Sequence, residues 1–178
     1  IEEGVPFTAV SAPSGARLIV AMADTDGARY EDFENYPQNT HSAPRLQSAT
    51  SVNYCESNPD YVARVGVTPT DEYGDGGYST DNGITWTPFA DFPLGSNGHK
   101  VQPSRIVVSS EADENGIPLA LLMVAVDGTA YRSTDSGASW TKLENFPANH
   151  TSQSFWLWEV RVIADKTNGK RFYVANDS

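Results

Sequence analysis

The sequence has 178 residues, with 12 basic and 23 acidic side chains and a formal net charge of -11. Such an acidic chain repels nucleic-acid phosphates and anionic lipid, so neither is an expected partner, whereas a neutral polysaccharide meets no such repulsion. The single cysteine, Cys55, excludes an intrachain disulfide and a cysteine-based zinc site. No apolar run approaches the roughly 18 residues that would span a membrane.

Short runs rich in β-branched and aromatic residues recur along the chain, separated by turn-forming residues. No window sustains the apolar spacing of an amphipathic helix without a Gly or Pro interruption. The sequence therefore predicts an all-β protein. The strand-like runs are residues 17–22, 61–67, 104–108, 120–126 and 171–174.

An internal repeat divides the chain. The segment from Tyr78 to Phe89 recurs from Arg132 to Leu143, and the two copies are about 54 residues apart. This period suits one four-stranded blade of a β-propeller with a generous loop. We therefore expect stacked blades, about three in residues 1–178, forming part of one propeller domain.

The repeated unit resembles the Asp-box of sialidases and other propeller hydrolases, at residues 79–86 and 133–140. In this turn the Asp carboxylate accepts backbone N–H bonds, the Gly adopts a positive φ, and the Trp ring is buried between sheets. This chemistry occupies the carboxylates, so we expect all eight motif residues to be structural. They are Ser79, Asp81, Gly83, Trp86, Ser133, Asp135, Gly137 and Trp140.

The segment Ala23-Asp24-Thr25-Asp26-Gly27-Ala28-Arg29-Tyr30-Glu31-Asp32 resembles the opening of the second propeller in the family 74 glycoside hydrolases. There the strand ends in Gly-Asp-x-x-Gly-Phe-Arg-His-Asp-Asp. This chain keeps the first Asp, the second Gly, the Arg and the last Asp, but has Ala23, Ala28 and Tyr30 in place of Gly, Phe and His. Segments 51–66 and 162–173 also look like strands of that domain, so the resemblance covers nearly the whole chain.

The resemblance implies a seven-bladed propeller that faces a second propeller across a cleft. Members of the family cut β-1,4-glucan backbones, xyloglucan among them, with inversion and with one Asp from each propeller. By position Asp24 is the general acid, and the second carboxylate lies outside this chain. Nearby Asp26, Glu31 and Asp32 would add negative charge around Asp24. No cofactor is implied, and the remaining blades or a partner propeller must complete the structure.

Aromatic faces for glucosyl rings are expected at Trp156 and Trp158, which share one side of an extended segment, although filling the core is the more common role of Trp. Arg29 and Tyr30 are further candidate substrate-binding residues. The three His residues, at 41, 99 and 150, have no metal-binding spacing. Asp24-x-Asp26-Gly27 resembles a fragment of a calcium loop but lacks its full spacing, so no metal site is expected.

Two other functions stay open. A non-catalytic carbohydrate- or protein-binding propeller is compatible with the changes at Ala28 and Tyr30. A sialidase-like exo-hydrolase would need an arginine cluster for a carboxylate sugar, and the Arg residues here are scattered. The chain starts at Ile1 without Met or a secretion signal, so we expect a mature product or a fragment, and the resemblance implies an extracellular location.

Overall fold

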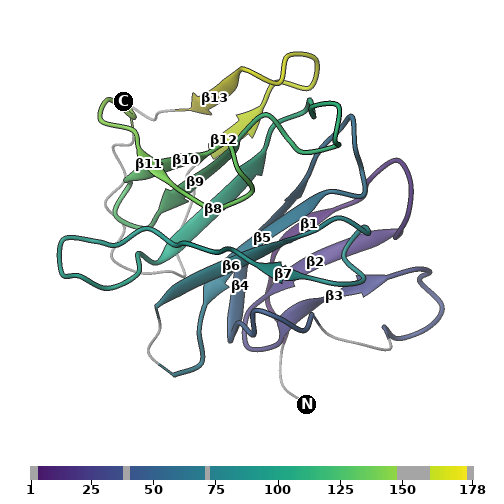
Figure 1. The fold of residues 1–178 in the computed structure, drawn as a ribbon. Coiled ribbons are helices and arrows are strands. Elements are labelled where there is room, and N and C mark those ends of the chain that lie inside the picture. The colour runs from purple at the N-terminus through teal and green to yellow at the C-terminus, as the bar shows by residue number, and fades with distance from the viewer. Residues whose placement is uncertain (1–3, 38–40, 71–72, 148–160, 176–178) are drawn as a thin grey trace.

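In the computed structural model, the described residues are 4–37, 41–70, 73–147 and 161–175. Within these ranges the chain contains strands and no helix. The strands form four antiparallel sheets that follow one another along the chain (Figure 1). The predicted all-β class is therefore confirmed.

Each sheet is built from consecutive strands. The first contains β1 (Pro6–Val10), β2 (Leu18–Met22) and β3 (Asp26–Tyr30). The second contains β4 (Ser48–Tyr54), β5 (Val62–Val67), β6 (Gly74–Ser79) and β7 (Thr87–Pro88). The third contains β8 (Pro103–Val108), β9 (Leu121–Ala125), β10 (Ala130–Ser133) and β11 (Thr141–Lys142). The fourth pairs β12 (Arg161–Ala164) with β13 (Phe172–Ala175).

The first strands of successive sheets pack against one another, β1 on β4, β4 on β8 and β8 on β12. Apolar side chains fill the space between each neighbouring pair of sheets, with Ile19, Val62 and Trp86 between the first two and Val65, Ile106 and Met123 between the second and third. β5 and β9 are buried at every residue because each lies in the middle of a sheet covered on both faces. Sheets arranged in this way are blades of a β-propeller.

Strand β6 is unusual because three of its six residues are glycines. A Cβ at Gly74 would lie 1.9 Å from the Val101 carbonyl oxygen, and one at Gly77 would lie 2.5 Å from the Thr87 carbonyl oxygen. The glycines therefore allow the backbone of neighbouring segments to approach closely. These positions need glycine because a side chain would collide with the neighbouring backbone. In the sequence alone, the same glycines indicate a loop.

The blades have two ends that differ in the turns they carry. The β2–β3 turn contains Asp24, whose backbone N–H reaches Ser48 at the start of β4. The two repeat turns connect β6 to β7 and β10 to β11, and Asn82 in the first of them contacts Ser14 and Ala16 in the β1–β2 connection. Because direction alternates between antiparallel strands, these sets of turns lie at opposite ends of the blades. We call them the Asp24 end and the repeat end.

Candidate active site

Asp24 lies at the centre of a tight turn. The Thr25 N–H donates to the Ala23 carbonyl at 2.8 Å, and Asp24 has a φ of +64°, which together are the features of a strained γ-turn. The backbone is anchored on two further sides, since the Ala23 N–H donates to Val5 O at 2.9 Å and the Asp24 N–H to Ser48 Oγ at 3.1 Å. The Asp24 side chain is exposed. Within the described part of the chain, no hydrogen bond engages its carboxylate.

A buried ion pair, Asp26–Arg64, lies next to this turn. Asp26 also has a positive φ, +66°, and its carboxylate pairs with the Arg64 guanidinium of the neighbouring blade. The Leu46 N–H donates to Asp26 Oδ2 at 3.0 Å, and Arg64 donates to the Pro44 carbonyl at 2.8 Å. Burial raises the pKa of Asp26, and the Arg64 charge opposes that rise. The pair ties the first blade to the second, two residues along the chain from Asp24.

Gly27 completes the hairpin. Its φ is +124°, and a Cβ on this residue would lie 2.0 Å from the Val20 carbonyl oxygen. Only glycine fits this position without moving the backbone. The retained glycine of the family-like segment therefore has a local steric reason.

Trp86 of the first repeat packs against both Arg64 and His41, and so connects the Asp26–Arg64 pair to that repeat. The Arg64 guanidinium sits 4.6 Å from the Trp86 ring centroid, and the His41 ring meets Trp86 edge-on at 5.0 Å. His41 is only 7% exposed, and its Nε2 has no hydrogen-bond partner among the described residues. Burial, together with the Arg64 charge, lowers the pKa of His41 to about 3. This His is therefore neutral at neutral pH.

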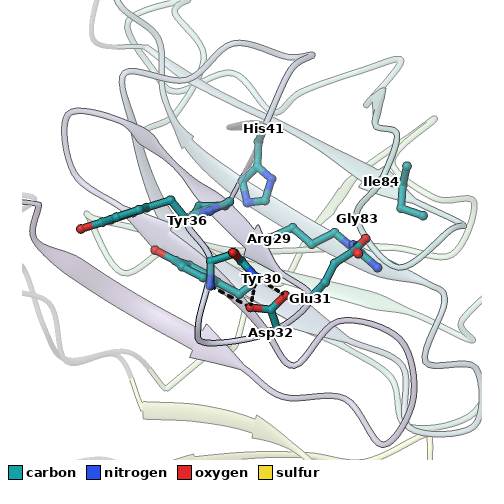
Figure 2. A pocket seen from close by; sticks show the side chains of 10 residues that line it. Arg29, Tyr30, Glu31, Asp32, Tyr36, His41, Gly83 and Ile84 are labelled. Atoms are coloured by element: carbon teal, nitrogen blue, oxygen red, sulfur yellow. Dashed lines mark hydrogen bonds and ion pairs between the residues drawn. The ribbon is translucent and has the colours of Figure 1, made fainter.

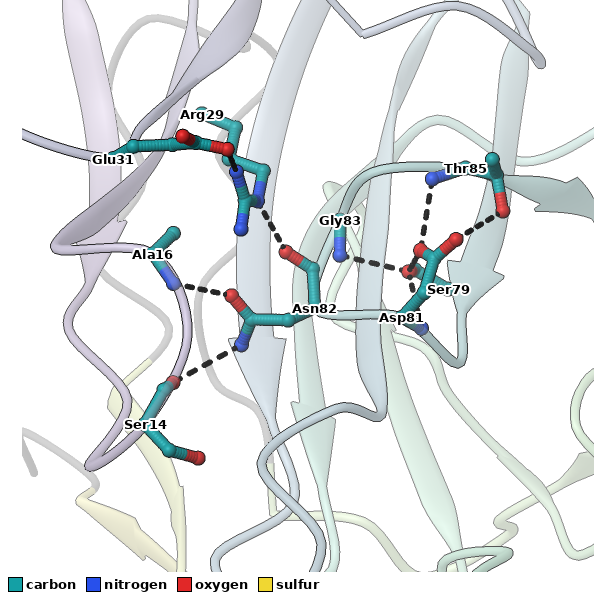
Figure 3. A network of polar contacts seen from close by, with 9 residues as sticks. All are labelled: Ser14, Ala16, Arg29, Glu31, Ser79, Asp81, Asn82, Gly83 and Thr85. Carbon is teal, nitrogen blue, oxygen red and sulfur yellow. Dashed lines mark hydrogen bonds and ion pairs between the residues drawn. The ribbon is translucent and has the colours of Figure 1, made fainter.

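The aspartates of the repeat turns have their oxygens engaged within the turn, as Figure 3 shows for Asp81. Asp81 accepts from Ser79 Oγ at 2.7 Å, from the Thr85 N–H at 2.8 Å and from Thr85 Oγ1 at 2.5 Å. Asp135 makes the equivalent bonds to Ser133 and Ser139, at 2.7, 2.9 and 2.6 Å. Hydrogen bonding in the turn lowers the pKa of both carboxyls. This geometry suits a structural role for both residues and lies at the end opposite to Asp24.

The first repeat turn also fastens one blade to the preceding one. Asn82, with a φ of +58°, accepts from the Ala16 N–H at 2.6 Å and donates to the Ser14 carbonyl at 3.4 Å (Figure 3). It also donates to the Pro59 carbonyl at 2.9 Å. Its carbonyl accepts from Arg29 Nε at 2.9 Å. Trp86 adds apolar contact between the same two sheets. The turn is therefore a junction between blades.

Arg29 and Tyr30 are not brought together with Asp24. In the β2–β3 hairpin Met22 pairs with Asp26 and Leu18 with Tyr30, so Tyr30 lies at the repeat end and Asp24 beyond the other end of the strand. Arg29 and Tyr30 instead line a pocket of about 420 Å³ with Glu31 and Asp32 (Figure 2). The expected negative charge around Asp24 is thus not supplied by Glu31 or Asp32, and Asp26 is neutralised by Arg64.

Trp156 and Trp158 lie outside the described residues, so their expected roles stay predictions. A second hollow of about 790 Å³ lies between the third and fourth sheets and is lined mainly by apolar side chains such as Leu122, Phe146 and Phe172. Its described lining residues include no carboxylate. Across the described ranges, no His, Cys, Asp and Glu residues gather in a group of three suited to holding a metal ion. Those ranges also contain no helix with the length and apolar character to cross a membrane.

Two supporting residues of the Asp24 turn were not identified from the sequence. Ser48 and Arg64 lie 24 and 38 residues away from their partners in the turn. The sequence does indicate that Arg64 belongs to a buried ion pair, because a cation inside the apolar run Val62–Val67 requires a buried partner. The sequence alone does not say which carboxylate provides it.

The chain is similar to known proteins in both sequence and fold. No family model matches the sequence. A xyloglucanase of a Paenibacillus species is 29% identical over 97% of this chain, which is 15% of that protein. The crystal structure of the family 74 xyloglucanase from Xanthomonas campestris aligns with a TM-score of 0.75 and 26% identity over 97% of this chain and 22% of that one. The family 74 enzyme of Niastella koreensis aligns with a TM-score of 0.70 and 29% identity, over 97% and 21%.

The chain thus spans only 15% to 22% of the length of these relatives. The similarity nevertheless extends over 97% of the chain in each case and holds in both sequence and fold. The predicted resemblance is confirmed: this chain is similar over nearly its whole length to one segment of the family 74 xyloglucanases.

Proposed function

We propose that this chain is the part of a xyloglucan-degrading glycoside hydrolase that supplies the general acid, Asp24. The observation that carries this proposal is the Asp24 turn. Its backbone is strained, anchored by hydrogen bonds to Val5 and Ser48, and leaves the carboxylate exposed with no bond to another described residue. Strained backbone that the surroundings hold in place is concentrated at functional sites.

The chemistry assigned to Asp24 is proton donation to the leaving glycosidic oxygen. In an inverting enzyme a second carboxylate, roughly 6.5–9.5 Å away, activates water on the opposite face of the sugar. Asp26 is unsuited to that role because Arg64 holds its carboxylate in a buried pair. Glu31 and Asp32 follow the opposite end of β3. We therefore propose that the base comes from another part of the protein or from another chain.

This assignment places the substrate against the Asp24 end of the blades. A partner propeller would face this end and close the cleft, and further blades would continue the ring to which this chain contributes about three blades. The substrate class is xyloglucan or a related β-1,4-glucan, after the relatives' activity. Because that polymer lies outside cells, we expect the protein to act there.

Substitution of Asp24 by Asn in the full-length protein tests the proposal. Hydrolysis of xyloglucan, measured as release of reducing sugar, should fall at least about a hundredfold, because general acid catalysis commonly contributes factors of 10²–10⁴. The matched control is Asp127→Asn, an exposed aspartate in the β9–β10 turn at the same end. Its turnover should stay within about threefold of the parent protein.

An Asp24→Asn protein with turnover within about threefold of the parent would overturn the assignment. A parent protein that binds xyloglucan without releasing reducing sugar would favour the non-catalytic binding propeller.

A further inference from the structure

A pocket at the repeat end combines aromatic rings with fixed polar groups. It lies where β3 ends beside the first repeat turn and is lined by Arg29, Tyr30, Glu31, Tyr36 and Ile84, among others. Figure 2 shows the side chains of Tyr30 and Tyr36 extending in the same direction from the loop and strand that carry them. Tyr36 is 92% exposed, so its ring is available to a ligand. The volume, about 420 Å³, is within the usual range for small-ligand sites.

Two polar groups of the pocket have fixed partners, Arg29 at the blade junction and Asp32 within its own loop. Arg29 donates to the Asn82 carbonyl at 2.9 Å and to Glu31 Oε1 at 2.6 Å. Asp32 Oδ1 accepts from the backbone N–H groups of Glu34 and Asn35 at 2.9 and 2.8 Å, which shapes the loop leading to Tyr36. A ligand would therefore meet preset donors and acceptors, which lowers the cost of ordering them on binding.

The charge of the pocket selects against anions. Arg29 is opposed by two carboxylates, Glu31 and Asp32, and His41 at the pocket wall is neutral at neutral pH. Phosphate, sulfate and carboxylate ligands would meet net negative charge. A neutral sugar fits better, since its C–H face packs on a tyrosine ring while its hydroxyls bond to the carboxylate and guanidinium groups.

We propose that this pocket binds a glycosyl unit of a neutral polysaccharide at the end of the blades opposite to Asp24. The choice of xyloglucan as the polymer rests on the proposed function, whereas the neutral-sugar chemistry rests on the pocket itself. Since Tyr30 and Asp24 lie at opposite ends of the same hairpin, the pocket holds the polymer and takes no part in bond cleavage.

Binding can be measured in the full-length protein carrying Asp24→Asn, by its retardation in gels that contain xyloglucan compared with gels without polymer. Adding Tyr36→Ala should weaken the apparent affinity about fivefold, from the loss of one aromatic stacking surface. The matched control is Phe33→Ala, a neighbouring aromatic that is 71% exposed but does not line the pocket, and it should leave retardation unchanged. Thermal melting of each variant checks that folding is kept.

Hydroxyl-radical footprinting gives a second measurement in a protein that keeps Tyr36. A change of fold caused by a substitution in the pocket cannot affect this result. Xyloglucan should protect Tyr36 at least about threefold more than Phe33, as expected when one of two exposed rings is covered. Equal protection of both rings, or unchanged retardation of the Tyr36→Ala protein, would overturn the proposal. Neither measurement depends on hydrolysis, so failure of the acid role of Asp24 would be seen separately in the turnover assay.

Discussion

The two ends of the blades use the same residue type in opposite ways. At the repeat end, Asp81 and Asp135 each accept three hydrogen bonds from their own turns. At the other end, Asp24 is held by its backbone while its carboxylate stays exposed and unbonded within the described residues. A carboxylate whose oxygens are occupied stabilises a turn, whereas one presented on an anchored turn is available for chemistry.

The largest expected effect comes from removing the support under Asp24. Replacing Arg64 by Met leaves Asp26 as an unpaired buried carboxylate, so the free energy of unfolding should fall by about 3–5 kcal/mol. The measurement is denaturant-induced unfolding of the purified protein. Arg64→Met combined with Asp26→Asn should cost less than the sum of the single changes, because no charge is then left unpaired. Additive losses would show that the pair is not what anchors this end.

The pH dependence of stability tests the environment of His41, which packs edge-on against Trp86 of the first repeat. The pKa of His41 is lowered from 6.5 to about 3 in the fold, so below pH 6.5 the unfolded chain takes up a proton that the folded chain does not. Stability should therefore fall as the pH drops through this window, by up to about 1.4 kcal/mol per unit. Melting curves between pH 7 and 5 measure the slope. His41→Gln should flatten it; an unchanged slope would mean that His41 titrates normally.

The smallest effect separates the two kinds of aspartate directly. Asp81→Ala removes three hydrogen bonds and should cost about 1–2 kcal/mol of unfolding free energy, at about 1 kcal/mol for each bond with partial compensation by water. Asp24→Asn removes no side-chain bond among the described residues and keeps a residue type that tolerates the positive φ, so it should change stability by less than about 0.5 kcal/mol. Chemical denaturation of both variants gives the comparison. Equal losses would remove the distinction between the two turns.

Local patterns in the sequence were enough for much of the fold. Each of the five expected strands has a counterpart in the structure, for example β9 at Leu121–Ala125, because a short apolar run bounded by turn-forming residues favours a buried strand. The repeat turns were predictable because their hydrogen bonds are local, and the bonds of the Asp81 carboxylate all lie within four residues. Strand β6 was missed because its glycines indicate a loop until the packed neighbours are known.

The site was less predictable because its contacts are long-range. Nothing in the local sequence links Arg64 to Asp26 or Ser48 to the Asp24 turn. The sequence also predicted that Glu31 and Asp32 would add negative charge around Asp24, on the basis of proximity along the chain. An extended strand advances about 3.3 Å per residue, so residues that follow the far end of β3 lie at the opposite end of the blade from Asp24.

We assign Asp24 to the chemical step and Asp81 to the stability of its turn. The direct measurement determines both xyloglucan turnover and melting temperature for Asp24→Asn and Asp81→Asn in the full-length protein. Asp24→Asn should lose at least about a hundredfold in turnover with its melting temperature unchanged. Asp81→Asn should melt at a lower temperature, by about 1–2 °C for each kcal/mol lost when a propeller domain about twice the size of this chain unfolds as a single unit, while turnover stays within about threefold. An Asp24→Asn protein of near-normal turnover, or an Asp81→Asn protein that melts normally and is inactive, would contradict the account.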